Sequence, residues 1–420
     1  MAVKGRDIAL RAASAVVLAP AAVAATWGGG VWFLALLIVA SVVLAFEWAA
    51  MSAPHARRVM GGAVSFGVVA AVIPWNAPFM LATVKIAPGL CAGNTMVMKT
   101  AEDAPPSCFL VPRVLEDGTR NPFALQRLKD KLGDRSNASS EIELDGTWGS
   151  LVGEEGRGVR TIIDMVSATR LDCVLGSAGT MRAALTRAVH HTRHRRAFGA
   201  LLVDQPLMRN VLTDLALESE AASLLGMRLA HAVDEGETEL TRLGVAVGKY
   251  WVCKRTSPFV AEALECLGGN GYVEENGMAR LYRQAPLNSI WEGSGNVNAL
   301  DVLRAIGREP ASLMALLKEA SVARGRLTTL DTALDEVERD CAGLAALDGV
   351  EAATGARRLV ERLALTLQGS LMVLHSPAEL TEAFVESRLG GAKGGSFGTL
   401  DAGFVATAAP TAIERASVTA

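Results

Sequence analysis

The sequence predicts a mainly α-helical protein, in which an apolar helical hairpin and a short α/β fragment precede a partial β domain and a helical bundle. Three observations predict this order. No residue from Ala12 to Phe46 is ionisable, short runs with turn signals between them continue to about residue 156, and helical spacing dominates the remainder. The spacing is clearest in leucines that recur as on the buried face of a helix, at Leu359, Leu363, Leu367, Leu371 and Leu374.

The composition limits the possible functions. The 41 basic and 44 acidic residues give a net charge of −3, which excludes a wholly cationic nucleic-acid binder. The six cysteines include no C-x-x-C pair, which fits neither a zinc ribbon nor a small disulfide scaffold. We therefore expect reduced thiols and no metal site.

Residues 1–58 are expected to form the apolar hairpin. Because about 20 apolar residues cross a bilayer as a helix, the run at 12–46 is long enough for two crossings, and glycines at 28–30 interrupt it. Flanking basic residues would keep both ends in the cytoplasm, so the hairpin would anchor a cytoplasmic domain to the inner membrane. A cleaved secretory signal ending near 22–24 and a buried soluble segment are the alternatives. The stretches RAASAVVLAP and FEWAAM, within about residues 1–55, resemble the membrane helices that begin phosphatidate cytidylyltransferases.

Residues 66–107 predict a short α/β unit, with a strand, a Pro-Trp-Asn turn, a helix and a second strand. The stretch FGVVAAVIPWNAPFMLATVKIAPGLCAGNTMVMKTAED resembles the cofactor domain of aldehyde dehydrogenases. The resemblance implies that Asn76 helps to hold an oxyanion and that Lys99 and Glu102 meet a nucleotide ribose. From the residues alone, Asn76 is a turn residue and Lys99 a solvated lysine. No later stretch supplies the nucleophilic cysteine and general-base glutamate of such an enzyme.

The rest of the chain divides into three parts. Residues 108–156 are expected to be a partial β domain, which would expose strand edges and apolar surface. Residues 157–310 are expected to be a bundle, and residues 311–420 a helical extension with a glycine-rich tail. The glycine-rich stretch at 388–400 is expected to be flexible, with packing against a neighbouring subunit as the alternative.

Three segments of the bundle contain residues suited to binding or catalysis. TRLD at 169–172 and RHRRAFGALLVDQ at 193–205 place guanidinium groups at a helix end, where they can hold a pyrophosphate. The glycines of ECLGGNGYVEE at 265–275 let a backbone approach a phosphate closely. RLYRQAPLNSIWEGSGNV at 280–297 places a glutamate beside a tryptophan. Taken singly, these are a solvated basic helix end, a helix-ending glycine turn and a surface glutamate.

Together these segments resemble the acyl-CoA dehydrogenase superfamily, and within it the alkylation-response (AidB-type) branch, over about residues 108–420. The resemblance implies FAD bound at a subunit interface, self-association into a dimer or tetramer through the bundle, and an acyl-CoA thioester as substrate. Only the second half of the family's β domain is expected here, and its amino-terminal helical domain is missing.

The resemblance also assigns roles to matching residues. Glu292 falls at the position of the base that removes the α-proton of the thioester while the β-hydrogen leaves as hydride to the flavin, and Trp291 would be the apolar wall. Such a base needs partial desolvation and hydrogen bonds to the thioester oxygen. Glu265 replaces the usual glutamine and cannot donate an amide hydrogen bond. The flavin-binding positions are Arg195, Phe198, Gln205, Gly268, Gly269, Gly271, Ser294 and Asn296.

Two further assignments concern cations. Arg170 matches a family position near the active site and is a candidate substrate contact, with a helix salt bridge to Asp172 or Asp164 as the alternative. Because the branch is associated with DNA, the basic patch between these segments is the candidate for phosphate contacts. Its arginines are Arg182, Arg187, Arg193 and Arg196, with His190, His191 and His194 between them.

The expected function is therefore an acyl-CoA dehydrogenase-like flavoprotein with weak or no turnover, because the domains that wall the acyl pocket are missing. A non-catalytic, DNA-associated alkylation-response protein is one alternative. An inactive, membrane-anchored fusion fragment is the other.

Overall fold

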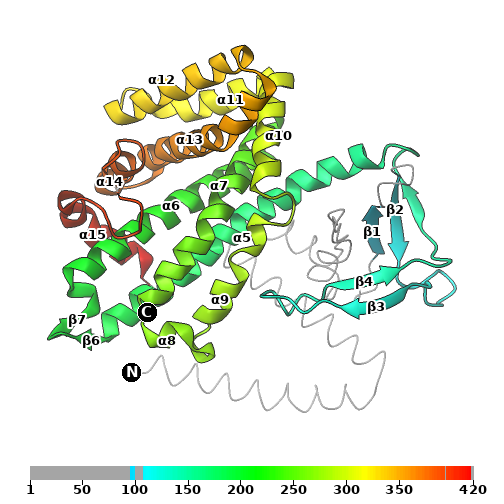
Figure 1. The fold of residues 1–420 in the computed structure, drawn as a ribbon, viewed down its shortest axis with the longest axis horizontal. Coiled ribbons are helices and arrows are strands. Elements are labelled where there is room, and N and C mark those ends of the chain that lie inside the picture. The colour runs from blue at the N-terminus through cyan, green and yellow to red at the C-terminus, as the bar shows by residue number, and fades with distance from the viewer. Residues whose placement is uncertain (1–94, 100–106, 393, 418–420) are drawn as a thin grey trace, which may run out of the picture.

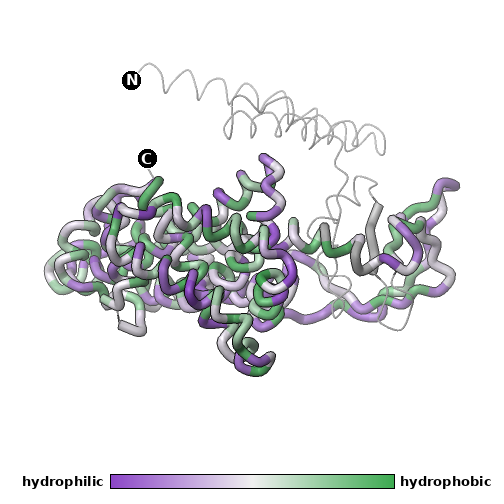
Figure 2. Tube along the Cα trace, turned by 90° about the horizontal axis from the view of Figure 1, so that it is seen from above, coloured by the Kyte–Doolittle hydropathy of each residue, from purple (hydrophilic) through white to green (hydrophobic). Residues whose placement is uncertain are grey.

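The computed structural model describes residues 95–99, 107–392 and 394–417, and this part of the chain is mainly helical. The hairpin expected at 1–58 and most of the α/β fragment expected at 66–107, including Asn76 and Glu102, lie outside the described residues. Within the described range, no helix combines the length and the apolar character needed to cross a bilayer. Hydrophilic and hydrophobic residues alternate along the bundle helices in Figure 2.

Two small sheets form the β part of the molecule (Figure 1). In the first, β2 (Cys108–Pro112) lies between β1 (Thr95–Lys99) and β5 (Ser150–Val152) and is antiparallel to both. In the second, β3 (Ala124–Leu128) pairs with β4 (Ser140–Glu143). The sheets are too small to enclose a large core.

Packing in the β part is sparse. Cys108 and Ile162 are the centre of a small buried cluster that joins the first sheet to the start of the first long helix. Every residue of β3 is exposed, and Leu125, Leu128 and Trp148 each expose more than half of their surface, at 61%, 68% and 53%. The β part therefore presents apolar surface to solvent.

A 37-residue helix, α5 (Gly158–His194), runs from the β part through the bundle (Figure 1). It packs along α6 (Pro206–Asp234) and α7 (Thr238–Glu265), and the β6–β7 hairpin with the 3-10 helix η1 (Leu202–Asp204) connects α5 to α6. The strands of that hairpin are β6 (Arg196–Ala197) and β7 (Ala200–Leu201).

The later helices pack against different members of this trio and against one another. They are α8 (Gly269–Tyr272), α9 (Met278–Gln284), α10 (Gly295–Arg308), α11 (Pro310–Ala320), α12 (Thr328–Gly343), α13 (Gly349–His375), α14 (Ala378–Arg388) and α15 (Ala402–Ala416). Local sequence sets several of their ends. Proline at the first position suits the starts of α6 and α11, and Asp348 with Glu351 forms a capping box at α13.

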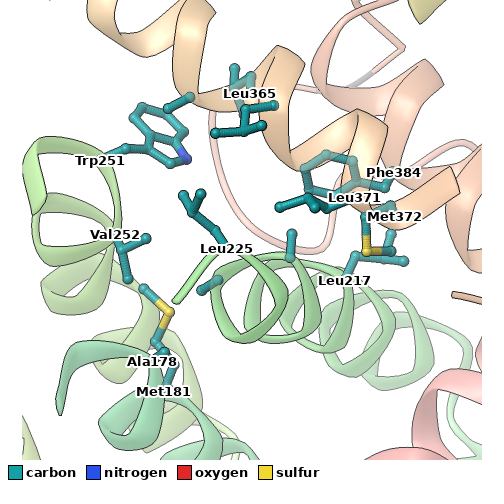
Figure 3. Close-up of a cluster of buried hydrophobic side chains, with 14 of the residues drawn as sticks. Ala178, Met181, Leu217, Leu225, Trp251, Val252, Leu365, Leu371, Met372 and Phe384 are labelled. Atoms are coloured by element: carbon teal, nitrogen blue, oxygen red, sulfur yellow. The ribbon is translucent and has the colours of Figure 1, made fainter. Parts of the chain in front are cut away.

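The main core lies where α5, α6, α7, α13 and α14 meet (Figure 3). Trp251 of α7 packs there, and its indole N–H donates to Gln368 Oε1 of α13 at 3.0 Å. The leucine spacing of α13 is buried from Leu359 to Leu371, but Leu374 is 40% exposed. Leu374 is therefore not part of the buried face that the spacing predicted.

The two ends of the glycine-rich stretch at 388–400 pack on α6 of the same chain, whereas the described residues between 390 and 396 are exposed, so the expected flexible stretch is anchored at both ends. The Gly398 N–H donates to Asp214 Oδ2 at 2.9 Å, and Asn210 exchanges two hydrogen bonds with the backbone of Leu400. Gly398 has φ +75°, and a Cβ there would lie 2.5 Å from a methyl of Val211. Glycine is thus used for close approach to a helix rather than for flexibility.

Candidate functional site

Glu292 lies in the loop between α9 and α10, and its side chain is enclosed rather than solvated. The residue is 4% exposed, and its backbone is left-handed, with φ +57° followed by +97° at Gly293. A non-glycine residue rarely adopts this conformation, so surrounding contacts must hold it. The surface-glutamate interpretation is therefore wrong for Glu292.

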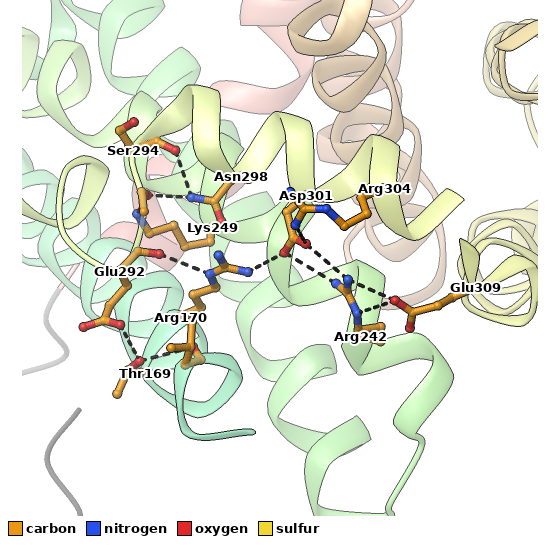
Figure 4. A network of polar contacts seen from close by, with 12 residues as sticks. Thr169, Arg170, Arg242, Lys249, Glu292, Ser294, Asn298, Asp301, Arg304 and Glu309 are labelled. Carbon is orange, nitrogen blue, oxygen red and sulfur yellow. Dashed lines mark hydrogen bonds and ion pairs between the residues drawn. The ribbon is translucent and has the colours of Figure 1, made fainter. Parts of the chain in front are cut away.

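Two neighbouring residues of α5 hold Glu292 (Figure 4). The buried Thr169 hydroxyl donates to Glu292 Oε2 at 2.9 Å, and Arg170 Nε donates to the Glu292 backbone oxygen at 3.1 Å. From α7, Lys249 Nζ donates to the backbone oxygens of Trp291, at 2.7 Å, and Gly293. Side chain and backbone of Glu292 are thus both fixed by long helices.

Arg170 pairs with Asp301 of α10 at 2.6 Å, a partner outside its own helix. Arg242 and Arg304 also contact Asp301. Burial works to raise the pKa of the Asp301 carboxyl, but Arg170 and Arg242 outweigh it, and the pKa falls below its ordinary value. The carboxylate is therefore ionised at neutral pH and anchors Arg170 beside the Glu292 loop.

The β6–β7 hairpin at the other end of α5 carries the second group of predicted residues. Phe198 is at its turn with φ +51° and is 96% exposed, and the Arg195 side chain is exposed beside it. Gln205 Nε2 donates to the Ala197 backbone oxygen at 3.2 Å, so this amide supports the hairpin. The hairpin offers a guanidinium and an aromatic ring to solvent.

The glycine turn at 268–271 follows α7. A Cβ on Gly271 would lie 2.2 Å from the Leu264 backbone oxygen, so only glycine lets the turn fold back on α7, whereas Gly268 and Gly269 are exposed with open space around them. Beside the turn, a surface cavity of about 300 Å³ reaches the far half of α5. It is lined by Thr186, Arg187, His190, His191, Leu267 and Asn276.

The predicted flavin residues therefore fall into two groups. Ser294 and Asn296 are exposed at the start of α10, beside Glu292, while the hairpin and the glycine turn lie near the end of α5. Thr169 and His194 are 25 residues apart on one continuous helix, which at 1.5 Å per residue is roughly 38 Å. The structure brings Arg170 to Glu292 and keeps Arg195 far from both.

The arginines of the predicted DNA patch are partly engaged by the chain itself. Arg193 pairs with Glu414 of α15 at 3.0 Å, and Arg182 donates to a backbone oxygen of α15. Arg187 and Arg196 donate to nearby backbone oxygens. Glu414 offsets the charge of Arg193, whereas the bonds of the other three arginines to backbone oxygens leave their charge in place, and DNA binding stays a prediction.

Sequence reasoning gave no site role to three residues that complete the Glu292 site, Thr169, Lys249 and Asp301. Lys249 is 1% exposed. A lysine within the apolar run GVAVGKYWVC is a usable signal, because lysine is almost never fully buried unless it is paired. The Arg304 contact of Asp301 is local, but Arg170 and Arg242 come from two other helices, so no local signal identifies Asp301 as part of the site.

Comparison with known families separates the two parts of the chain. Residues 156–307 match the model of the acyl-CoA dehydrogenase C-terminal domain, and residues 40–129 match the aldehyde dehydrogenase family. The bundle has the acyl-CoA dehydrogenase C-terminal fold. The aldehyde dehydrogenase match is longer than the expected fragment at 66–107 and overlaps the first strands of the β part.

Two curated relatives are similar to about half of this chain. The chain is 51% identical over 220 residues to the putative acyl-CoA dehydrogenase AidB of Escherichia coli (strain K12), covering 51% of this chain and 40% of that protein. It is 34% identical over 236 residues to acyl-CoA dehydrogenase family member 11 of Caenorhabditis elegans, covering 54% and 38%. The chain thus spans about two fifths of the length of these relatives.

A solved structure carries the same fold. The crystal structure of C. elegans ACDH-11 in complex with C11-CoA superposes with a TM-score of 0.58 at 27% identity, over 70% of this chain and 56% of that one. The resemblance of residues 1–55 to cytidylyltransferases stays a prediction.

Proposed function

We propose that this chain is an acyl-CoA dehydrogenase-like flavoprotein of weak turnover, in which Glu292 removes the α-proton of an acyl thioester. The observation that carries the proposal is the enclosed Glu292 carboxylate, fixed through Thr169 and through a backbone that two cations hold. A base must be held within hydrogen-bond reach of its proton, and residues on rigid helices provide that precision. A surface glutamate in a loop would have no such support.

The residues present fit FAD in the chemistry of their donors. The exposed Arg195 guanidinium can pair with a pyrophosphate, the exposed Phe198 ring offers an apolar face, and the open backbone at Gly268 and Gly269 admits a phosphate. When bound, FAD would take the β-hydrogen of the acyl chain as hydride.

Self-association is part of the proposal. The two groups of flavin residues lie roughly 38 Å apart along α5, which exceeds the length of one extended FAD molecule. Ser294 and Asn296 of one copy would therefore meet the flavin ring, while the hairpin of a second copy would hold the ADP end. We attribute weak turnover to the described β part, whose two small sheets are too small to wall a deep acyl pocket beside Glu292.

The test is the anaerobic reduction of protein-bound FAD by acyl-CoA thioesters. The reduction is measured as the loss of visible flavin absorbance. The first thioesters would be near the length of C11-CoA, which the C. elegans structure holds. We expect slow bleaching that Glu292→Gln reduces at least about 100-fold, the usual contribution of a general base. The matched control is Glu275→Gln, an exposed glutamate, which should bleach like the wild type. Equal rates for Glu292→Gln and the wild type, or no bleaching with any thioester, would refute the proposal.

A further inference from the structure

The loop around Glu292 is held by an unusual set of donors. The backbone oxygens of three successive residues, 291 to 293, each accept a hydrogen bond from a cationic side chain. Lys249 supplies the two outer bonds and Arg170 supplies the middle one. Asn298 adds a bond to the Gly293 oxygen at 2.6 Å. Two cationic side chains, Lys249 and Arg170, therefore hold the bend in this loop.

Of the two cations, Lys249 is the one whose hydrogen bonds both go to the Glu292 loop. Arg170 has a second task, because it also pairs with Asp301, whereas both hydrogen bonds found for the Lys249 amine go to the Glu292 loop. Burial lowers the pKa of Lys249, which expresses the cost of placing an ammonium group in the core. Filling the space alone would need no amine, since methionine has a similar length. The chain carries this cost at a position where the amine donates to two backbone oxygens of the Glu292 loop and where the Glu292 carboxylate adds a smaller favourable electrostatic effect.

The conformation that these bonds hold is an unfavourable one. Glu292 is left-handed at φ +57°, a region that side chains with a Cβ avoid. Without Lys249, the Trp291 oxygen would lose its cationic donor and the Gly293 oxygen would depend on Asn298. The loop would then relax toward ordinary backbone angles, and the carboxylate would turn away from the Thr169 hydroxyl, 2.9 Å away.

We propose that Lys249 is a positioning residue, which holds the backbone oxygens on both sides of Glu292 and thereby keeps its carboxylate on Thr169. The importance of this role rests on the proposed function of Glu292 as a base. The structural effect itself requires neither flavin nor substrate, so it can be measured on the full chain alone.

The experiment compares Lys249→Met with the wild type by two measurements. Hydrogen exchange should be at least about 10-fold faster at the amides of Trp291 and Asn298, which are hydrogen-bonded within the loop and at the start of α10. The carboxylate infrared band of Glu292, isolated by subtracting the spectrum of the matching Glu292→Gln variant, should shift as it does in Thr169→Val. A general loss of packing would not reproduce the Thr169→Val shift.

Arg228→Met is the matched control. Arg228 is a mostly enclosed cation of the same bundle, paired with Glu237 and Glu319 and not with the loop. It should leave both the exchange and the infrared band unchanged. If Lys249→Met does not fold, Lys249→Gln, which keeps an uncharged donor, should show smaller changes in the same direction. A folded Lys249 variant with wild-type exchange and an unshifted band would overturn the proposal. Failure of acyl-CoA reduction together with the expected shift would overturn the proposed function alone.

Discussion

The ion pair between Arg170 and Asp301 offers the sharpest prediction about stability near Glu292. The side chains are 14% and 12% exposed and lie 2.6 Å apart, so both charges are largely removed from water. Breaking a buried pair by removing one partner costs about 3 to 5 kcal/mol. Asp301 keeps Arg242 and Arg304 as partners, so we expect the lower end, about 3 kcal/mol, for Arg170→Met.

Arg242 provides the internal comparison. Its side chain is 31% exposed and lies 3.2 Å from Asp301, so solvent screens the pair, and Arg242→Met should cost about 1 kcal/mol. Urea, which is uncharged and does not screen ion pairs, would unfold the variants, with far-UV circular dichroism following the helices. A double-mutant cycle with Asp301→Asn should give a larger coupling energy for Arg170 than for Arg242. Equal couplings, or a loss below about 1 kcal/mol for Arg170→Met, would show that the pair is hydrated in solution.

Acid should weaken the same network. Its arginines hold the pKa of Asp301 below the ordinary value near 3.9. The stabilisation that the Asp301 carboxylate contributes is therefore complete above about pH 4 and is lost as pH falls through the folded-state pKa. Urea unfolding across pH should then show the wild type and Asp301→Asn converging only below about pH 4, and convergence at pH 6 would contradict this. Arg388→Met should lower the free energy of unfolding by about 3 kcal/mol, because it removes a buried guanidinium that pairs with the fully buried Asp214 and with Glu218. A loss below about 1 kcal/mol would count against a dry pair. Gly398→Ala should cost about 1 to 3 kcal/mol, because its Cβ would lie 2.5 Å from Val211, and a neutral effect would mean that the tail does not pack on α6.

The helical bundle and the Glu292 segment could be predicted because both depend on short-range patterns. Leucines three or four residues apart identify a buried helix face without any knowledge of its partner. The segment IWEGSG carries a glutamate and the glycines of a bend, and its resemblance to a family loop, rather than the local residues, made Glu292 the predicted base. Leu374 departs from its pattern because a helix continues past the edge of the core.

The contacts that complete the site could not be predicted, because they join residues distant in sequence. Asp301 lies 131 residues from Arg170, and Lys249 lies 42 residues from Trp291. Their meeting depends on how α5, α7 and α10 pack together. The packing of Gly398 could not be predicted for a similar reason, since composition indicates flexibility but only the neighbouring α6 shows why glycine is required there.

The central claim, a flavin site built on this bundle, is tested most directly by the visible absorbance spectrum of the purified chain after incubation with FAD. We predict stoichiometric flavin that is lost in Arg195→Met and retained in Arg209→Met, which changes an arginine in the first turn of α6. A colourless protein that takes up no added FAD, or equal flavin in both variants, would contradict the account.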